Sequence, residues 1–322
     1  MLKVLIVGCG KIAGIQSQLT STHGGAYHAN KNIKISACFD IDLKKSKNFA
    51  KLYHCQVELN LLEALNKHKP DIVSVCTPDN THFEITKELL TNNHKPKVIF
   101  LEKPACQTNN ELEQLINLSK ECNTSIVVNQ TRRFDQNHQQ LRLEISQGKF
   151  GNLINADVTY YSGWQHNGIH IIDTLFFLFD DPIEIKKVTK KIESPYLNDP
   201  TLELTGVFKN SNAKINISSF DEKYYQIFEI DLRFSSARLR IEDFGERILL
   251  EERYINDIGE NVIQLVDNGL SENTEDPMVG AIMDIIRSIE QNNPSILDGY
   301  LLQDVSQSMQ MIWKGQEMAQ KL

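Results

Sequence analysis

Short apolar runs alternate with longer amphipathic stretches over the first 130 residues of the chain. The runs are four to seven residues long and rich in Val, Ile and Phe, which is typical of strands buried on both faces. They are Lys3–Val7, Ile33–Phe39, Ile72–Cys76, Val98–Leu101 and Ser125–Val128. The stretches between them predict helices over Asp42–Leu52, Leu61–His68, Thr81–Asn92 and Asn109–Cys122. This alternation predicts an α/β domain with a doubly wound parallel sheet.

The pattern changes after residue 130. One more helix is expected over Asp135–Gly148, and the stretches that follow alternate in polarity, as strands of a half-exposed antiparallel sheet do. These strands are expected at Leu153–Tyr161, Leu202–Phe208, Ala213–Phe220, Gln226–Phe234 and Ala237–Ile241. The remaining helices are expected at Gly168–Phe179, Val279–Gln291 and Leu301–Lys321. We therefore predict two domains, residues 1–130 and residues 131–322, the second built on an open, largely antiparallel sheet.

Charge argues against nucleic acid or an anionic membrane as the main partner, because the 322 residues carry a formal net charge of −8. Residues 1–130 hold 15 basic and 12 acidic side chains (+3), which leaves 19 and 30 (−11) of the totals 34 and 42 for the rest. No apolar run approaches the ~18 residues of a membrane span. The opening Met1–Val7 lacks the features of a signal peptide, so a cytoplasmic protein is expected.

The six cysteines all lie in the first half of the chain. None is spaced as Cys-x-x-Cys, and several lie within apolar runs. Buried, reduced thiols are the expectation, and no zinc site or disulfide framework is predicted.

A glycine-rich turn follows the first apolar run. Gly8, Gly10 and Ala13 fit the pattern Gly-x-Gly-x-x-Ala, in which the first glycine allows a tight turn and the second lets the backbone approach a pyrophosphate. A helix is expected to start here, with its free N–H groups facing the phosphates. Such a loop by itself is a weak signal, but directly after the first buried strand it predicts a dinucleotide site.

An acidic residue ends the second strand. A carboxylate at Asp40 can accept hydrogen bonds from the adenosine ribose and would repel a 2′-phosphate, which favours NAD over NADP. Lys44 and Lys45 leave an alternative, since either could meet a phosphate. The extra length before this strand predicts a long loop over Thr20–Asn32 beside the cofactor cleft.

A charged pair, Glu102-Lys103, follows the fifth buried strand and precedes Pro104. Ligands of open α/β sheets bind beyond the carboxyl ends of the strands, so a site is a better interpretation than a solvated surface pair.

Two histidines and an aspartate recur at helical spacing in the second half. If the segment is helical throughout, His166, His170 and Asp173 share one face. They could be satisfied polar groups in a packed interface, a metal site, or acid–base residues against a substrate hydroxyl. Arg133, beside Arg132, could form an ion pair or bind a substrate carboxylate or phosphate at two points.

Taken together, these motifs resemble the Gfo/Idh/MocA oxidoreductases, the family of glucose–fructose oxidoreductase and inositol dehydrogenase. The resemblance covers the first 180 residues and implies an N-terminal Rossmann domain and a C-terminal α/β domain whose last helix packs back on the first. The matching segments are Gly8–Gly14, Cys76–His82, Glu102–Pro104, Arg133-Phe134 and Gly168–Asp173.

The resemblance also implies roles. Lys103 would lie near the nicotinamide and the reacting carbon, and Glu102 would help to hold the nicotinamide ribose. The other residues expected to line the cofactor are Gly8, Gly10, Lys11, Ile12, Asp40, Thr77, Pro78 and His82. His170 would act on the substrate, with Arg133, His166, Asn167 and Asp173 as substrate-binding residues. No metal is expected.

This chain departs from the family at His166, where members carry an aspartate. A second imidazole titrates differently and could bind an anionic substrate group. The Asn167-Gly-x-His170 form resembles the branch linked to bacterial surface-polysaccharide sugars.

The expected function is NAD-dependent hydride transfer at a secondary alcohol or keto carbon of a sugar or nucleotide-linked sugar. The alternatives are a non-catalytic dinucleotide-binding regulator, an inositol or aldose dehydrogenase, and an NAD-dependent glycosidase. The resemblance also implies a homodimer or homotetramer, because the uncovered sheet would otherwise expose a large apolar face.

Overall fold

The computed structural model describes residues 1–270 and 275–322, which form two compact units. Unit 1 comprises Met1–Asp135 and Glu275–Ser306, and unit 2 comprises Gln136–Thr274 and Gln307–Leu322. The sequence-based boundary at residue 130 did not assign residues 275–306 to the first domain. Most of the last helix belongs to unit 2, and its expected packing on the first domain stays a prediction.

Unit 1 is built on a six-stranded parallel sheet with the order β3-β2-β1-β4-β5-β6. Its four-residue strands β4 and β5 are buried along their whole length, which explains their continuous apolar sequence. The expected doubly wound parallel sheet is confirmed. The strands are β1 (Leu2–Val7), β2 (Ile33–Phe39), β3 (Gln56–Glu58), β4 (Ile72–Val75), β5 (Val98–Leu101) and β6 (Ser125–Val128).

Several helices of unit 1 begin at polar capping residues. Asp42 and Asn60 each accept a backbone N–H at the start of a helix, and Thr108 forms a capping box with Glu111. The helices are α1 (His23–His28), α2 (Leu43–Tyr53), α3 (Leu61–His68), α4 (His82–Thr91), α5 (Asn109–Cys122), α6 (Thr131–Phe134) and α9 (Pro277–Glu290), with 3₁₀ turns η1 (Asp79–Thr81) and η4 (Pro294–Leu297).

The segment after the glycine turn differs from the expectation. No helix starts at the turn. Residues 11–14 form a turn instead, closed by the Gly14 N–H donating to Lys11 O at 2.9 Å. The predicted loop over Thr20–Asn32 contains α1, whose cap is Thr22. Its first residues are tied to that turn, because the His23 and Gly24 N–H groups donate to the carbonyls of Ile12 and Ala13.

The returning segment completes the core of unit 1. Apolar side chains of α9, including Ile282 and Ile285, lie in one buried cluster with β1, β2 and β5. Beyond η4, Leu301 bridges Val127 of β6, and the Val128 N–H donates to Tyr300 O at 3.1 Å. These contacts explain why the structure assigns this part of the chain to unit 1.

Unit 2 is built on an eight-stranded sheet with the order β14-β13-β12-β11-β7-β10-β9-β8. β7 and β10 run parallel and the other neighbours are antiparallel, so the expected open, largely antiparallel sheet is confirmed. The strands are β7 (Leu153–Tyr161), β8 (Ile183–Ile192), β9 (Thr201–Phe208), β10 (Lys214–Phe220), β11 (Phe228–Phe234), β12 (Ala237–Glu242), β13 (Arg247–Ile255) and β14 (Asn261–Val266), with the 3₁₀ turn η3 (Asp243–Gly245).

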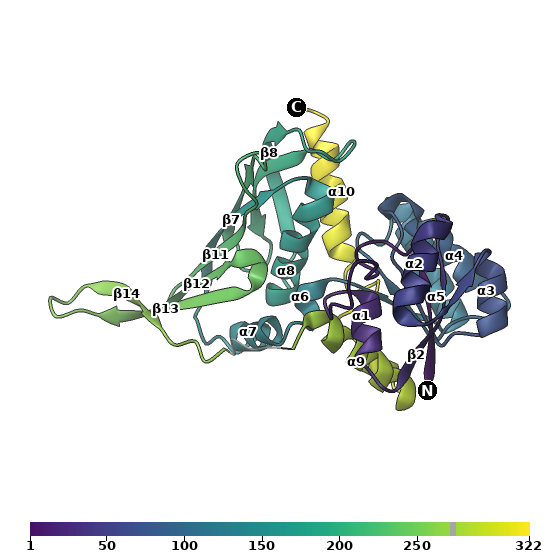
Figure 1. Ribbon diagram of the computed structural model, residues 1–322. Helices are drawn as coiled ribbons and strands as arrows, with labels where there is room; N and C mark the ends of the chain where they lie inside the picture. The colour runs from purple at the N-terminus through teal and green to yellow at the C-terminus, as the bar shows by residue number, and fades with distance from the viewer. Residues whose placement is uncertain (271–274) are drawn as a thin grey trace. The chain divides into compact units, whose positions relative to one another are not determined.

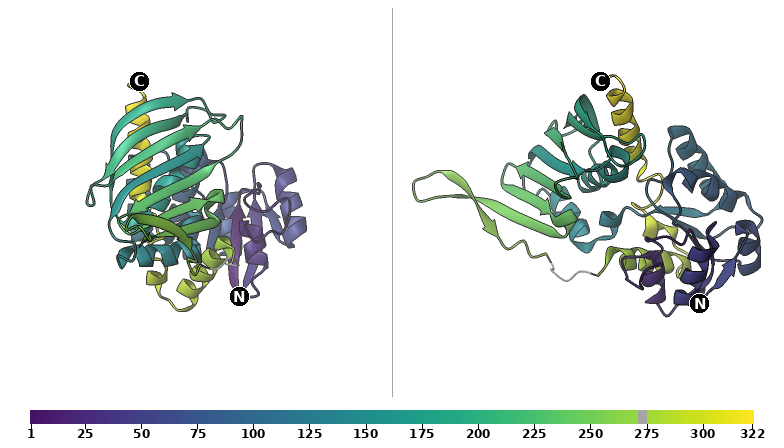
Figure 2. Two further views of the ribbon diagram at one scale, coloured as in Figure 1. Left: turned by 90° about the vertical axis from the view of Figure 1, so that its left-hand side faces the viewer. Right: turned by 45° about the horizontal axis from the view of Figure 1, so that its top comes forward.

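Helices lie behind one face of this sheet, as the left view of Figure 2 shows. Trp164 anchors them: its Nε1–H donates to Ile312 O at 2.8 Å, and a Cβ at Gly315 would stand 2.5 Å from the same nitrogen. Only glycine therefore permits this close approach of the last helix. The helices are α7 (Gln136–Ser146), α8 (Ile169–Phe179) and α10 (Ser306–Ala319), with η2 (Trp164–Gly168), a single π-helical turn (Figure 1).

The other face of the sheet carries charged side chains, contrary to the expected apolar face. Arg233 pairs with Asp157 and Asp231, and Arg238 pairs with Asp231 and Glu251. Asp231, Arg233 and Arg238 alternate along β11 and β12 with buried leucines and isoleucines. An apolar face in need of cover is therefore no argument for self-association through this surface.

The two edge strands of this sheet differ in charge. β8 carries Lys186, Lys187, Lys190 and Lys191. β14 has the sequence NVIQLV, without a charged residue, and its Ile263 and Leu265 are exposed. β14 is the second strand of a long β13–β14 hairpin (Figure 1). Lysines on an edge strand oppose pairing with a further strand, whereas an uncharged apolar edge permits it.

Among the helices in the described part of the chain, none combines the length and the apolar character that crossing a bilayer requires.

Candidate functional site

The carboxyl ends of β1 and β4 meet where the strand order of unit 1 reverses. Open α/β sheets bind ligands at such a switch point. Gly8 ends β1 with φ +87°, and a Cβ there would stand 2.8 Å from the backbone of Cys76 and from the side chain of Thr77. Gly8 is therefore required by its backbone conformation and by the close approach of the loop after β4.

Gly10 has the opposite environment. No atom lies within 4 Å of the position that its Cβ would occupy, so the backbone is open on this side. Lys11 and Ile12, which follow in the turn, are exposed. An uncovered glycine beside exposed turn residues fits a loop that a pyrophosphate can approach. The helix N-terminus expected to face those phosphates is missing, since the turn takes its place.

Asp40 follows β2 and contacts the glycine loop directly. Its Oδ2 accepts the Cys9 N–H at 2.7 Å, and its Oδ1 accepts the Asp42 N–H at 2.7 Å. Each carboxylate oxygen has a second lone pair, so these bonds leave capacity for ribose hydroxyls. Asp40 thus fixes the loop and places a negative charge beside it.

The loops after β4 and β5 are joined by His82, at the start of α4. Its Nε2 lies 2.8 Å from Thr77 O, and its Nδ1 lies 2.7 Å from Pro104 O. Both oxygens only accept, so a neutral ring donates to one of them and a cationic ring to both. The Thr77 Oγ1 accepts from the Thr81 hydroxyl at 2.8 Å, and Pro78 precedes η1. His82, one of the predicted cofactor residues, is fully buried and joins these two loops.

Glu102 follows β5 and is 8% exposed. Its Oε1 lies 2.8 Å from His23 Nε2 and accepts the Asn129 Nδ2–H at 2.6 Å. Burial opposes ionisation of Glu102, but the hydrogen bonds from His23 and Asn129 and the charges of His23 and Lys103 outweigh it and hold the pKa of the carboxyl below its ordinary value. Glu102 is therefore a buried carboxylate, directly before the half-buried Lys103.

Arg133, on α6, is 4% exposed and is held by backbone carbonyls of unit 1. Its Nη1 donates to Gly299 O at 2.6 Å, and its Nη2 donates to Asp304 O at 3.4 Å. These bonds fasten the returning segment to α6, a structural role that the sequence did not reveal.

In unit 2, the histidine segment is divided by η2. His166 and Gln165 donate their N–H groups to the two oxygens of Asp199, at 2.8 and 2.7 Å. The His166 ring stacks on Tyr196, with centroids 3.8 Å apart. The Asn167 Nδ2–H donates to Ser162 O at 2.9 Å.

His170 and Asp173 belong to α8. His170 is half-buried, and its carbonyl accepts from the Thr174 hydroxyl at 2.6 Å. Asp173 is buried, and its Oδ1 accepts from the Ser308 hydroxyl of α10 at 2.8 Å. His166 and Asp173 therefore face different elements, because the wider π-helical turn breaks the single helical face that the spacing suggested.

The structure thus brings the predicted cofactor residues of unit 1 to one end of its sheet, and it places the predicted substrate residues of unit 2 on η2 and α8. Among the described residues, no group of three or more His, Cys, Asp or Glu side chains could hold a metal ion.

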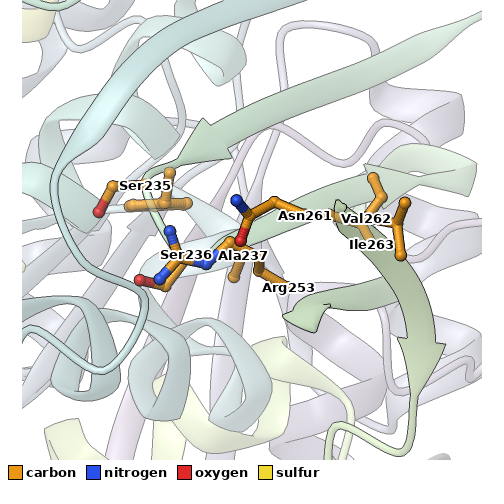
Figure 3. Close-up of a pocket in the computed structure, with 8 residues that line it drawn as sticks. Ser235, Ser236, Ala237, Arg253, Asn261, Val262 and Ile263 are labelled. Carbon is orange, nitrogen blue, oxygen red and sulfur yellow. The ribbon is translucent and has the colours of Figure 1, made fainter. Parts of the chain in front are cut away.

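Unit 2 also has a hollow of about 450 Å³ at the base of the β13–β14 hairpin (Figure 3). Within the described part of the chain, no residue predicted as functional lines it. Its lining residues are Phe234, Ser235, Ser236, Ala237, Arg253, Asn261, Val262 and Ile263.

Sequence reasoning missed His23, Ser74 and Asn129 around Glu102, and it missed Asp199 beneath His166. The one local signal was His23 itself, which follows Thr22 in a Gly-rich stretch. From the sequence it is a loop residue, and only the fold shows that it lies beside β5.

The residues of unit 1 fit a dinucleotide: an open glycine backbone, an acidic residue beside it, and a charged pair at the end of β5. When bound, a nicotinamide supplies or accepts hydride. The chain's own groups can hold the cofactor and move protons.

Comparison with known proteins gives concordant results. Residues 2–130 match the family described as "Oxidoreductase family, NAD-binding Rossmann fold". The chain is 26% identical over 153 residues to a D-glucoside 3-dehydrogenase of Escherichia coli, which covers 47% of this chain and 41% of that protein. It spans about half the length of the curated relatives it matches.

Two solved structures share the fold over nearly the whole chain. A putative NADPH-dependent oxidoreductase from Desulfitobacterium hafniense aligns with a TM-score of 0.82 at 15% identity, covering 99% of this chain and 96% of that one. A UDP-N-acetylglucosamine 3-dehydrogenase from Acidithiobacillus ferrooxidans aligns with a TM-score of 0.76 at 15% identity, covering 98% and 97%.

Proposed function

We propose that this chain, whose residues 2–130 match the Gfo/Idh/MocA oxidoreductase family, is an NAD-dependent oxidoreductase acting on a sugar or nucleotide-linked sugar. Hydride would pass to or from a secondary alcohol or keto carbon. The observation that carries the proposal is the open backbone of Gly10 beside the Asp40 carboxylate, at the switch point of the sheet.

NAD is proposed over NADP because of Asp40. Its carboxylate is fixed beside the glycine loop by two N–H groups, where it can accept ribose hydroxyls and would repel a 2′-phosphate. Glu102, Thr77 and the turn residues Lys11 and Ile12 complete the proposed cofactor contacts, with Pro78 and His82 shaping the loop.

The proton is proposed to move through Lys103 and His170. In the oxidative direction His170 accepts the hydroxyl proton of the substrate, and Lys103 stabilises the developing alkoxide or relays the proton. His166 and Asn167 are proposed to contact the substrate. Arg133 and Asp173 already hold internal partners, so replacing either is expected to lower stability as well as substrate binding.

The proposed substrate class includes nucleotide-linked sugars of bacterial surface polysaccharides. Support comes from His166, whose imidazole can bind an anionic group when protonated. The names of the D-glucoside 3-dehydrogenase and the UDP-N-acetylglucosamine 3-dehydrogenase indicate which compounds to test first.

The test is to mix the purified protein with NAD and a panel of glycosides, inositols and nucleotide sugars, and to follow nicotinamide absorbance. Reduction of NAD with one substrate class supports the proposal. Binding without turnover across the panel would favour a dinucleotide-binding regulator, and release of an aglycone without net cofactor change would identify a glycosidase. With an active substrate, Lys103→Ala and His170→Ala should each lower the rate by about 10²–10⁴-fold.

Residues 131–322 are proposed to bind the substrate and to join copies of the chain into a homodimer or homotetramer. The charged face of the unit 2 sheet would make such an interface sensitive to salt. Sedimentation velocity at low and high ionic strength tests this assembly. If the protein is a monomer at both ionic strengths, the proposal is wrong.

A further inference from the structure

His23 is a fully buried histidine that the proposed mechanism does not use. It begins α1, and its backbone N–H donates to Ile12 O in the turn after the glycine loop at 3.1 Å. Its ring packs against Phe100 of β5, with centroids 4.6 Å apart. The residue therefore links the glycine loop to the strand that ends at Glu102.

Both ring nitrogens of His23 have partners from other strands. Nδ1 lies 3.1 Å from the Ser74 Oγ of β4, and Nε2 lies 2.8 Å from the Glu102 Oε1 that follows β5. Ser74 in turn contacts the hydroxyl of Tyr27 at 2.9 Å, and Glu102 accepts from Asn129, which follows β6. A single buried network thus crosses the ends of β4, β5 and β6 beside the switch point.

Lys103 lies between two residues whose polar groups are held by histidines. On one side, the Glu102 carboxylate is held by His23, and on the other side the Pro104 carbonyl is held by His82. The backbone from which Lys103 projects is consequently fixed at both neighbours. We propose that His23 is a positioning residue for Lys103: by binding Glu102 it fixes the end of β5 and the negative charge next to the lysine. This inference rests on the proposed function only for the role of Lys103 in turnover.

The ionisable groups that face Glu102 are His23, Lys103 and Cys76. Burial and the Glu102 charge raise the pKa of the Cys76 thiol well above its ordinary value, so that thiol stays neutral. Lys103 is then a cationic neighbour of the carboxylate, and His23 is its hydrogen-bond partner. Without His23, the balance at Glu102 moves toward the protonated form, because burial is then opposed only by Asn129 and Lys103, and the negative charge beside Lys103 is reduced. The unprotonated fraction of Lys103 should rise.

The experiment measures how fast Lys103 reacts with acetic anhydride at fixed pH, by mass spectrometry of the Lys103 peptide. The variants are His23→Gln, which keeps a hydrogen-bond donor without a cationic form, and His23→Leu, which removes both. The matched control is His68→Gln, since His68 Nε2 also lies 2.7 Å from a carboxylate oxygen, that of Glu58, next to a different strand of the same unit. NADH fluorescence titration and circular dichroism are recorded on every sample.

We expect Lys103 to react about threefold faster or more in both His23 variants, equal to about half a pKa unit, and at the wild-type rate in His68→Gln. Equal Lys103 rates in wild type and in folded His23→Gln and His23→Leu would overturn the proposal. If neither variant folds, Ser74→Ala is tested instead, because it removes the partner of the His23 Nδ1. This substitution should also raise the labelling rate of Lys103. An unchanged rate would contradict the proposed role of His23.

The two proposals fail differently. If wild type binds neither NADH nor NADPH, the proposed function is wrong, whereas the labelling result still decides whether His23 sets the surroundings of Lys103. A purely structural role of His23 would lower the melting temperature without changing the labelling rate of the folded protein.

Discussion

His23 Nε2 lies 2.8 Å from Glu102 Oε1, although 79 positions separate the two residues in the chain. The pair is buried inside unit 1, where removal of either partner takes a hydrogen bond from the other buried polar group. It therefore ties the stability of unit 1 to pH.

Glu102→Gln tests this link. Because the pKa of the folded carboxyl is lowered, its contribution to the free energy of unfolding is present above the ordinary pKa of 4.5 and is lost as pH falls through the folded value. We expect the variant to be less stable than wild type by about 1–3 kcal/mol at pH 7 and to lose less stability on acidification. Urea denaturation at several pH values measures both, with the exposed Glu121→Gln as control. A parallel acid loss in both proteins would show that Glu102 is not responsible.

Gly8 and Gly10 should respond differently to alanine. Gly8→Ala puts a Cβ 2.8 Å from the Cys76 backbone at a positive φ, so the left-handed conformation alone should cost about 1–2 kcal/mol and the melting temperature should fall. Gly10→Ala meets no atom and should keep the melting temperature while weakening NADH binding. Thermal melts and NADH titrations separate the two, and normal NADH binding by Gly10→Ala would remove this glycine from the cofactor site.

Asp40→Ser should change the choice of cofactor. Loss of the charge beside the glycine loop should lower the preference for NADH over NADPH, measured as the ratio of their affinities, by about tenfold, or about 1.4 kcal/mol. Asp42→Ser is the matched control, because serine can still cap α2 while a neighbouring charge is lost. The same ratio in wild type and Asp40→Ser would contradict the role given to this carboxylate.

Asp199→Ala should destabilise unit 2. It leaves the part-buried N–H groups of Gln165 and His166 without their acceptor, and we expect unit 2 to lose about 1–3 kcal/mol in total. The His166 ring should also leave Tyr196, which the chemical shifts of the His166 ring would report. A variant with wild-type stability and unchanged shifts would mean that Asp199 does not hold η2.

Gly315→Ala should loosen the last helix. A Cβ at this position stands 2.5 Å from Trp164 Nε1 and competes with the bond to Ile312 O, so overpacking should cost about 1–3 kcal/mol. Tryptophan fluorescence during denaturation follows the change. Lys314→Ala, at an exposed position of the same helix, should melt like wild type, and a similar loss there would point to the helix in general.

The elements that the sequence predicted best are those whose environment is uniform along the chain. β5 is buried on both faces, so its four residues are all apolar and its bounds match the prediction. The bounds of α5, Asn109–Cys122, also match the prediction, and Thr108 caps its start. In these cases local chemistry determines the structure.

The misses occur where distant contacts override local preference. Gly24 and Gly25 are poor helix formers, yet α1 forms there because its first N–H groups find acceptors in the turn at Ile12 and Ala13. The same dependence hid the network around Glu102, since Ser74 and Asn129 come beside it only through the strand order.

The candidate site was partly visible for the same reason. Glycines and an acidic residue at fixed spacing after the first two strands predict a cofactor loop, because their chemistry is local. The face shared by His166 and Asp173 was inferred from a regular helical period, and one π-helical turn was enough to send them to different neighbours.

The unequal borders of the unit 2 sheet limit how copies of the chain can polymerise. Lys186, Lys187, Lys190 and Lys191 repel an incoming strand at β8, so of the two edges of this sheet only β14 can accept one. When two molecules pair through β14, the β14 edge of each is occupied. Neither molecule then has an uncharged edge of this sheet available for a third. Strand addition through the unit 2 sheet would therefore stop at a pair of molecules.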